Sequence, residues 1–306
     1  MGNAAVQSLA VIDQDFFARF CAEWRQRVDQ ALAQHTAYGP DCPDRLREAI
    51  RHSLLAPAKR LRPLLVLLSC QACGGEPERA LPAACAVEMV HTYSLIHDDL
   101  PAMDDDDLRR GRPSCHAQFG EATAILAGDA LLAHAFELLA THVVPPELAA
   151  VCCGELAQAA GACNLVGGQQ DDLMAQFATP DLAQLERIHR RKTGAMICVS
   201  VRLGGRIGGA TQKQLAVLTS YGQKIGLAFQ IVDDLLDLEG QTEAMGKRVG
   251  KDAKKGKLTF PSLMGVEASR QRAGELVAAA EAVLSDGDLD SVGLVQLARF
   301  IVKRST

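Results

Sequence analysis

Apolar residues recur along most of the chain at the spacing of helical faces, and no alternating runs of Val, Ile and Thr bounded by turn residues appear. Proline and glycine divide this pattern into segments. Pro145-Pro146 is expected to open a helix, and Thr211 with Gln214 resembles a helix capping box. Three glycine pairs follow apolar stretches and are expected to cap helices: Gly74-Gly75, Gly167-Gly168 and Gly204-Gly205. The pattern predicts an all-α protein with about ten helices and no strands.

The longest predicted helices are expected to pack as a central bundle, near residues 81 to 100, 118 to 141, 147 to 166, 181 to 203 and 212 to 239. The interval from Gly240 to Gly256 differs, because it is rich in Gly and Lys and almost without apolar side chains. Such a segment is expected to be a mobile loop. Since it follows a helix that ends in aspartates, we interpret it as a lid; the alternative is an ordinary solvated connection.

Composition and charge narrow the class of protein. The chain has 306 residues, of which 48% are hydrophobic and 4% aromatic. This helix-favouring composition favours a single domain over residues 1–306. A net charge of -5 argues against a nucleic-acid partner, because no uncompensated basic face is available.

Two features bear on where the protein works. The N-terminus lacks a recognisable targeting segment, and the longest strongly apolar run, Leu64 to Leu68, is too short to span a bilayer. We therefore expect no membrane insertion and a cytoplasmic location. The ten cysteines are expected to stay reduced and to act as small buried hydrophobic residues. Cys70 and Cys73 form a C-x-x-C, but no second pair or histidine pair completes a zinc site.

The densest charge in the chain lies between Asp98 and Asp107, where six aspartates fall within ten residues. The preceding segment has the pattern of a buried helix, so Asp98 and Asp99 fall at its C-terminal end. Pro101 is expected to end or kink that helix and so to let Asp104 fold back toward Asp98. Converging carboxylates are typical of a Mg²⁺ site that water and a substrate phosphate complete. The alternative is a solvated acidic turn.

Further charged residues support the metal interpretation. Arg109 and Arg110 directly follow the first aspartate motif and are placed to bind a phosphate by charge-assisted hydrogen bonds. A second aspartate motif ends another apolar helix, where Asp233 and Asp237 are four residues apart and share one face. Like charges at this spacing repel each other, so on so apolar a helix we expect both carboxylates to face one metal ion.

The two aspartate motifs, with Lys59-Arg60-Leu61-Arg62-Pro63 upstream, resemble the short-chain trans-prenyltransferases of the polyprenyl synthetase family, and specifically its bacterial farnesyl (geranyl) diphosphate synthases. The resemblance covers nearly the whole chain, with further matches in order at Gly128-Asp129, Gly168-Gln169, Lys192-Thr193-Gly194, Phe229-Gln230 and Lys247 to Lys257. It implies the isoprenoid synthase fold, a helical bundle around a deep central cavity. It also implies a homodimer, and we expect apolar helix faces near 118 to 141 to form the contact.

The implied reaction is the Mg²⁺-dependent, sequential head-to-tail (1'-4) condensation of isopentenyl diphosphate with dimethylallyl and then geranyl diphosphate, giving farnesyl diphosphate and diphosphate. Breaking the allylic carbon-oxygen bond requires fixed positive charge for the leaving group in a site that excludes water. The departing diphosphate is the expected base for the final proton.

The resemblance also implies site residues. About three Mg²⁺ ions would be held by Asp98 and Asp104, with Asp99 in support, and by Asp233 and Asp237. The allylic diphosphate would be bound by Arg109, Lys192 and Lys257, with Lys247 nearby. The isopentenyl diphosphate would lie on Lys59, Arg62, His91 and Arg110. The backbone carbonyl of Lys192, the hydroxyl of Thr193 and the amide oxygen of Gln230 would face the carbocation.

Product length follows from helix depth. Tyr93 lies five residues before Asp98, hence ~7.5 Å deeper along the helix axis, and its ring is expected to form the floor of the product pocket. Ser94 beside it is too small to close the pocket alone. The resemblance agrees, since two extra residues within the first aspartate motif, between Leu100 and Met103, accompany a fifteen-carbon product in farnesyl-producing bacterial members. One departure is Ala58 where the family usually has glycine; if alanine distorts the loop, Ala58→Gly should lower the KM for isopentenyl diphosphate.

Other functions were weighed against this one. The same family includes geranyl and geranylgeranyl diphosphate synthases, which remain alternatives. A His-Asp metal phosphohydrolase is suggested by His91 and His97-Asp98, but it would need further histidine ligands and would leave the second aspartate motif without a role. A terpene cyclase shares only the first motif. A non-catalytic helical partner subunit would tolerate the loss of a motif, and none is lost.

Overall fold

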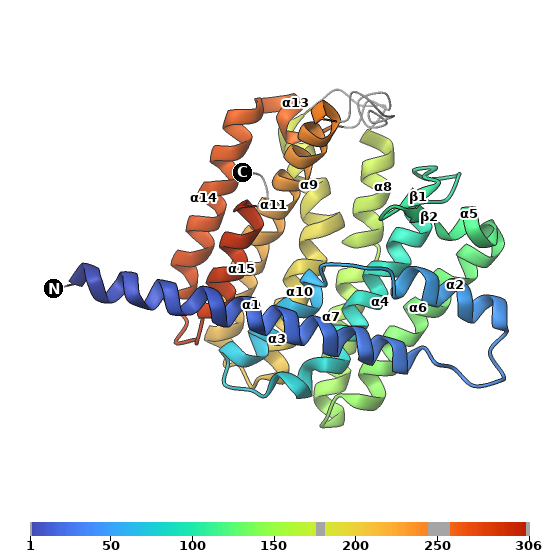
Figure 1. The fold of residues 1–306 in the computed structure, drawn as a ribbon, viewed down its shortest axis with the longest axis horizontal. Coiled ribbons are helices and arrows are strands. Elements are labelled where there is room, and N and C mark those ends of the chain that lie inside the picture. Colours follow the sequence, from blue (N-terminus) through green and yellow to red (C-terminus); the bar gives the residue numbers. More distant parts are fainter. Residues whose placement is uncertain (1, 176–180, 244–257, 304–306) are drawn as a thin grey trace.

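The computed structural model describes residues 2–175, 181–243 and 258–303, and helices make up almost all of this part of the chain (Figure 1). The predicted all-α class is confirmed. In chain order the helices are α1 (Gly2–His35), α2 (Asp44–Leu54), α3 (Leu61–Ala72), the 3-10 turn η1 (Pro77–Ala80), α4 (Leu81–Asp98), α5 (Cys115–Phe119), α6 (Glu121–His142), α7 (Pro146–Ala160), α8 (Leu165–Ala175), α9 (Leu182–His189), the π-helical turn η2 (Arg190–Gly194), α10 (Ala195–Ile207), α11 (Gln212–Glu243), α13 (Phe260–Met264), α14 (Val266–Leu284) and α15 (Val292–Lys303).

The prediction of no strands was wrong at one short hairpin. Strand β1 (Leu108–Arg109) pairs antiparallel with β2 (Arg112–Pro113) directly after the first aspartate motif. Arg110 and Gly111 form its two-residue loop and both have positive φ, 54° and 74°. A tight hairpin loop requires such backbone angles at both central positions. The hairpin therefore holds Arg109 and Arg110 beside the aspartates.

The helices surround α4, which packs against α6 on one side and α3 on the other, while α10 lies between α3 and α11. α14 covers α11, and α1 runs across the outside of α3, α4 and α15 (Figure 1). Because α3 and α4 are enclosed, their buried residues lie around the helix and not along one stripe. Leu65, Met89 and Leu131 are fully buried, and each such side chain stabilises the fold by about 1.5–3 kcal/mol.

Several predicted helix boundaries are confirmed. Gly74, with φ of 83°, follows the end of α3, and α7 begins at Pro146. Thr211 and Gln214 form the expected reciprocal cap, since the backbone N–H of Thr211 donates to Gln214 Oε1 at 2.8 Å and the backbone N–H of Gln214 donates to Thr211 Oγ1 at 3.2 Å. α4 ends before Pro101, as expected.

Other boundaries were wrong. The predicted helices 118–141, 147–166 and 181–203 are each divided, into α5 and α6, α7 and α8, and α9, η2 and α10. Gly168 and Gly204 lie inside α8 and α10 and do not cap helices. Their role is close packing: a Cβ on Gly204 would lie 2.0 Å from the carbonyl oxygen of Val66. Sequence alone does not distinguish a glycine at a helix crossing from one at a helix end.

The predicted lid begins later than expected. α11 continues through Gly240 to Glu243, so the helix is four residues longer than predicted. Residues 244–257 lie outside the described part of the chain, and with them Lys247 and Lys257. The lid and these two lysines therefore stay predictions.

The expectation about apolar stretches was also wrong. Two helical stretches, Glu121–His142 and Pro146–Ala175, are long and apolar enough to cross a membrane by length and composition, although 39% and 33% of their windows are buried inside the protein. α6 packs against α2, α4 and α7. Its Ile125 and Leu126 are nevertheless 43% and 57% exposed, so this helix carries apolar surface that the described part of the chain does not cover.

Candidate active site

The first aspartate motif folds back on the end of α4, as predicted. The backbone N–H of Asp104 donates to the carbonyl of Asp98 at 2.8 Å, and that of Asp106 donates to the carbonyl of Asp99 at 3.1 Å. Asp105, with φ of 52°, turns the chain between these two bonds. The motif is therefore a compact turn in which Asp104 returns to the helix end.

Two cations of the protein already engage this motif. The Arg109 side chain donates hydrogen bonds to the buried Asp99 carboxylate from Nε, 2.9 Å from Oδ1, and from Nη2. Lys192 Nζ lies 3.8 Å from Asp98 Oδ2. Burial raises the pKa of Asp98 to about 6, with Lys192 lowering it and Asp104 raising it. The charge of Asp98 is thus only partly compensated, which favours an additional cation.

Lys192 comes from η2, a π-helical turn between α9 and α10. Wide turns of this kind occur mostly inside helices at functional sites. Two glycines let other helices approach it: a Cβ on Gly168 of α8 would lie 2.4 Å from the Lys192 backbone nitrogen, and one on Gly226 of α11 would lie 2.8 Å from Gly194 Cα. Because a Cβ fits at neither place, both glycines are needed to hold the turn against α8 and α11.

The structure adds two residues that the sequence interpretation missed. Asp172 on α8 accepts a hydrogen bond from Lys192 Nζ at 2.8 Å, so it shares this ammonium with Asp98. Gln169, one turn earlier, has a buried amide whose nitrogen and oxygen find no hydrogen-bond partner among the described residues. The sequence did contain a signal for these two residues: Gln169 belongs to the Gly168-Gln169 match with the family, and Asp172 lies three residues after it.

In the second aspartate motif the three carboxylates differ. Asp233 is half-buried and Asp237 exposed, and both line the same cavity. Asp234 is buried and accepts hydrogen bonds from Gln230 Nε2 at 3.1 Å and from the backbone N–H of Phe260 at 2.9 Å. Burial raises the pKa of Asp234 to about 7, while its two hydrogen bonds lower it. Asp234 is therefore anchored within the protein by Gln230 and Phe260, and it does not line the large cavity.

A cavity of about 1140 Å³ lies between the start of α3 and α4, α11 and α15, and it collects most of the predicted residues. They are Lys59, Arg62, His91, Arg109, Arg110, Gln230, Asp233 and Asp237. Asp98, Tyr93 and Ser94 line a smaller cavity of about 260 Å³ together with Gln169. Thr193 is buried and donates to Gln230 Oε1 at 2.9 Å. Eleven of the predicted residues thus line these two cavities. Asp99 borders a separate small cavity with Arg109 and Arg110, and Asp104, Lys192 and Thr193 line neither of the two.

The basic side of the large cavity is crowded with like charge. Burial, and then the neighbouring guanidiniums, lower the pKa of His91 well below its usual value. Burial lowers the pKa of Arg62, with Arg110 lowering it further and Glu88 and Asp233 raising it, and Arg62 Nε has no hydrogen-bond partner among the described residues. The pKa of Arg110 is also lowered by burial and by Arg60 and Arg109. Such a group of cations favours an anion.

Arg60, in contrast, is a structural residue. It is 2% exposed and donates to Glu88 Oε1 and Asp29 Oδ1, each at 2.7 Å. It is also the residue of this loop with left-handed backbone angles, at φ of 51°. Ala58 is not among the described residues with positive φ, so the conformation does not require glycine at that position. The suspected distortion by Ala58 has no support in the backbone.

The donor set fits a hard divalent cation. Among the described residues, no three His, Cys, Asp or Glu side chains converge as a complete metal cluster. Mg²⁺ does not need one, because it is usually held by one or two carboxylates together with water and substrate phosphates. Asp98 and Asp104 after α4, and Asp233 and Asp237 on α11, offer only oxygen ligands. The Asp98 side chain is 13% exposed, so a cation bound there would offset a charge that burial destabilises.

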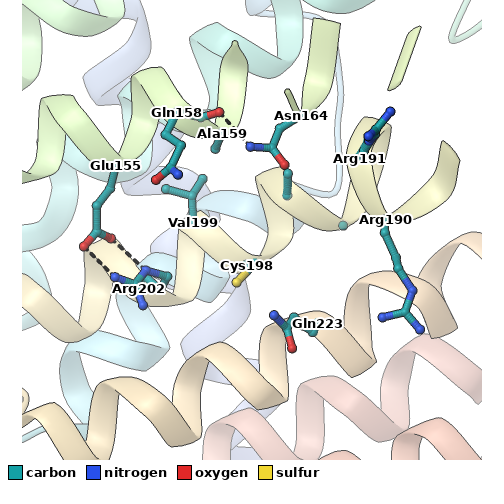
Figure 2. A pocket seen from close by; sticks show the side chains of 12 residues that line it. Glu155, Gln158, Ala159, Asn164, Arg190, Arg191, Cys198, Val199, Arg202 and Gln223 are labelled. Carbon is teal, nitrogen blue, oxygen red and sulfur yellow. Dashed lines mark hydrogen bonds and ion pairs between the residues drawn. The ribbon is translucent and has the colours of Figure 1, made fainter. Parts of the chain in front are cut away.

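A further cavity of about 330 Å³ lies apart from these residues, between α7, α10 and α11 (Figure 2). Its arginines are already paired: Arg202 donates to both oxygens of Glu155 at 2.9 and 2.7 Å, and Arg190 and Arg191 pair with carboxylates on α9 and α8. This cavity contains none of the predicted site residues and no uncompensated charge that would select a ligand.

Comparisons with known proteins agree with this geometry. The family model described as polyprenyl synthetase matches residues 43–288. The chain is 43% identical to the farnesyl diphosphate synthase of Geobacillus stearothermophilus, over 94% of this chain and 97% of that protein. It is 46% identical to geranylgeranyl pyrophosphate synthase 12 of Arabidopsis thaliana, over 92% and 80%. The apo crystal structure of an FPP/GFPP synthase from Zymomonas mobilis superposes with a TM-score of 0.82 at 38% identity, over 96% and 99% of the two chains.

A helical bundle in which the second aspartate motif shares a cavity with basic residues agrees with a prenyltransferase of the isoprenoid synthase fold. The chain belongs to the polyprenyl synthetase family. The predicted family, fold and class of enzyme are confirmed, and the His-Asp phosphohydrolase is set aside.

Proposed function

We propose that the protein condenses isopentenyl diphosphate with dimethylallyl diphosphate and then with geranyl diphosphate, and releases farnesyl diphosphate. The observation that carries this proposal is the division of the cavity into an acidic and a basic side. The reaction needs two diphosphates held in different ways, since one must leave and the other must stay attached. Asp233 and Asp237 border the same cavity as Arg62 and His91, which suits one metal-assisted and one metal-free diphosphate.

On the basic side, Arg62, Arg110 and Lys59 bind the isopentenyl diphosphate. Charge-assisted hydrogen bonds to phosphate are roughly twice as strong as neutral ones. Burial lowers the pKa values of Arg62 and Arg110, and neighbouring arginines lower them further, so a bound anion would offset both effects. His91, neutral because of burial and the arginines around it, donates a hydrogen bond without adding charge.

On the acidic side, Asp98 and Asp104 would hold Mg²⁺ with Asp99 in support, and Asp233 and Asp237 would hold a further ion. About three Mg²⁺ would supply the positive charge that stabilises the departing diphosphate. Asp99 is fully engaged by Arg109, so its role is to orient that arginine toward the phosphates. We also propose that Lys192 and the two lysines outside the described residues, Lys247 and Lys257, bind the allylic diphosphate.

The ionising carbon lies between these sides. Thr193, Gln230 and the Lys192 carbonyl provide oxygens there, and Thr193 donates its proton to Gln230 Oε1. With that proton engaged, the lone pairs of the hydroxyl are available to a positive carbon. Water is excluded by the packed helices and, we propose, by the segment that follows α11.

Product length is set by Tyr93. Its side chain is 6% exposed and lines the 260 Å³ cavity next to Asp98, where its ring meets that of His97 edge-on at 5.7 Å. A tail anchored at the aspartates would meet this ring. Because relatives of similar identity include a geranylgeranyl pyrophosphate synthase, a twenty-carbon product is the alternative, and a geranyl product requires a floor nearer the aspartates.

We further propose a cytoplasmic homodimer. The exposed Ile125 and Leu126 on α6 lie in the region expected to form the contact, and burying them would remove apolar surface from water. None of the ten cysteines forms a disulfide, and five of them, including Cys85 and Cys152, are buried. Unpaired cysteines suit a reducing compartment.

Chromatography of the products formed from labelled isopentenyl diphosphate, dimethylallyl diphosphate and Mg²⁺ tests the proposal. The wild type is expected to stop at fifteen carbons. Tyr93→Ala should open the floor and give products of twenty carbons or more, with the first condensation little affected. Ser94→Ala, next to it in the same cavity, is the matched control and should keep the fifteen-carbon product. A Tyr93→Ala enzyme that still stopped at fifteen carbons would place the floor elsewhere.

A further inference from the structure

A line of hydrogen bonds connects the second aspartate motif to the proposed carbocation site. The backbone N–H of Phe260 donates to Asp234 Oδ2 at 2.9 Å, and Gln230 Nε2 donates to Asp234 Oδ1 at 3.1 Å. Gln230 Oε1 in turn accepts the proton of Thr193 Oγ1 at 2.9 Å. In the structure each bond of this line has one direction, from Phe260 to Asp234, from Gln230 to Asp234 and from Thr193 to Gln230.

Asp234 is the residue that sets the direction. It is 7% exposed, lies one turn after Gln230 on α11, and its two carboxylate oxygens each accept one of these bonds. With Asp234 accepting both bonds, the Gln230 amide presents its nitrogen to Asp234 and its oxygen to Thr193. The threonine proton then points at Gln230.

The surroundings hold Asp234 in place. Phe260 begins α13 and stacks on His189 at 5.5 Å. Burial lowers the pKa of His189 to about 4, so its ring is neutral, and its Nε2 lies 3.7 Å from Asp234 Oδ2. Asp234 is thus packed between α11, α9 and α13, while Asp233 and not Asp234 lines the large cavity.

We propose that Asp234 is a positioning residue that fixes the polarity of the carbocation site: it orients the Gln230 amide so that oxygen lone pairs of Gln230 and Thr193, and no N–H or O–H, face the developing positive charge. This inference rests on the proposed function, in which these two residues meet the cation. Oriented dipoles that need no rearrangement during the reaction stabilise a transition state more than free ones.

An amide at position 234 tests the polarity directly. In Asp234→Asn one oxygen still accepts from Phe260, but the new Nδ2 group faces Gln230. The Gln230 amide is then expected to turn over, donate to Thr193 and leave the threonine proton directed at the cavity. The kcat should fall about 10²-fold, as when one oriented group is lost from a catalytic site, while the KM for both diphosphates and the Mg²⁺ concentration for half-maximal rate stay within about threefold of wild type. A metal ligand would change the Mg²⁺ requirement.

Exchanging the two groups should restore the polarity. In Gln230→Glu with Asp234→Asn, the amide at 234 donates to one oxygen of the new carboxylate, whose other oxygen accepts from Thr193. The double variant is expected to recover at least tenfold in kcat over Asp234→Asn. Gln230→Glu alone places two carboxylates one helical turn apart and should be poor. Circular dichroism and melting curves of all variants report whether the fold is kept.

The outcomes distinguish a failure of the proposed role of Asp234 from a failure of the proposed function of the enzyme. Wild-type kcat in Asp234→Asn, or a double variant no better than both single variants, would overturn the role of Asp234. Gln230→Met removes the amide altogether; if it kept the wild-type kcat, the proposed role of Gln230 at the cation would fail whatever Asp234 does. A wild-type product other than farnesyl diphosphate would overturn the proposed product and leave the comparison of variants intact.

Discussion

The acidic side of the candidate site, at the first aspartate motif, differs from the basic side of the large cavity in how the protein balances its charge. On the acidic side Asp99 is held by Arg109, and Asp98 lies near Lys192. On the basic side Arg62 and Arg110 both border the large cavity, and Glu88, which borders it too, is bonded to Arg60.

This difference shows what each side needs. Arg109 and Lys192 balance part of the charge on the acidic side. On the basic side Glu88 and Asp233 offset part of the charge of Arg62, yet burial, together with neighbouring arginines, still lowers the pKa values of Arg62, His91 and Arg110. We therefore expect an anion to stabilise the basic side strongly, and metal binding to compete with contacts that exist before it arrives.

The largest effect is expected from breaking the acidic side. Asp98→Ala or Asp233→Ala should lower turnover about 10³-fold at saturating Mg²⁺, because each removes a ligand for the charge that stabilises the leaving diphosphate. Circular dichroism should show an unchanged helical fold. Asp107→Ala is the matched control, since that carboxylate is 82% exposed at the end of the same motif, and it should keep most of the activity. Near-normal turnover in Asp98→Ala or Asp233→Ala would contradict the metal assignment.

Breaking the basic side should have a smaller and different effect. Arg62→Gln removes one charged phosphate contact, worth about 1.5–3 kcal/mol, and should raise the KM for isopentenyl diphosphate about 10- to 100-fold with the allylic KM unchanged. Because it also relieves repulsion around Arg110 and His91, the ligand-free variant should melt at or above the wild-type temperature. Arg112→Gln, on the exposed hairpin, is the control. A rise in both KM values would show that the two sides do not bind separate diphosphates.

Contacts within one helix and its following turn could be predicted from the sequence, whereas contacts between helices far apart in the sequence could not. The fold-back of Asp104 and the short distance from Tyr93 to Asp98 follow from one helix and its proline, and they were predicted. The pairing of Lys192 with Asp172 depends on α8 crossing η2 at Gly168. Residue spacing does not encode such a crossing, and there the glycine was taken for a cap.

The same reasoning explains the missed charges. No role was assigned from the sequence to Arg60, which is buried because Glu88, 28 residues later, faces it from α4. Nor was a role assigned to Asp234, which follows Asp233 on α11 but accepts a hydrogen bond from Phe260 and does not line the large cavity. Whether a charge is paired is decided by tertiary packing, and only its position on a helix is local.

The pH dependence of stability should separate the two sides in the metal-free protein. Burial raises the pKa of Asp98 to about 6, so its ionisation costs stability as the pH rises through 6. Asp98→Asn should therefore melt a few degrees above the wild type at pH 8, and the difference should shrink as the pH falls toward 4. The pKa of His91 is lowered in the folded protein, so as the pH falls below about 6.5 His91 becomes protonated in the unfolded state but not in the folded state. His91→Gln should match the wild type at pH 8 and melt above it only below about pH 6.5. If the melting temperatures of both variants depended on pH in the same way, the expected difference between the acidic and basic sides would be contradicted.

The smallest effect is expected at Ala58, in the loop that leads to the basic side. The sequence suggested that alanine distorts this loop, because the family usually has glycine there. In the structure the left-handed angle of the loop belongs to Arg60, at φ of 51°, and that residue is held by Glu88, by Asp29 and by the carbonyl of Leu54 at 2.8 Å. The loop is therefore shaped by the arginine's partners, and the Cβ of Ala58 demands no unusual backbone.

Ala58→Gly should leave both KM values within about twofold of wild type and lower stability by at most about 1 kcal/mol, since glycine adds freedom to the unfolded chain. Steady-state kinetics with each diphosphate varied in turn will measure this, and a several-fold fall in the KM for isopentenyl diphosphate alone would show that alanine does restrict the approach of Lys59 to that substrate.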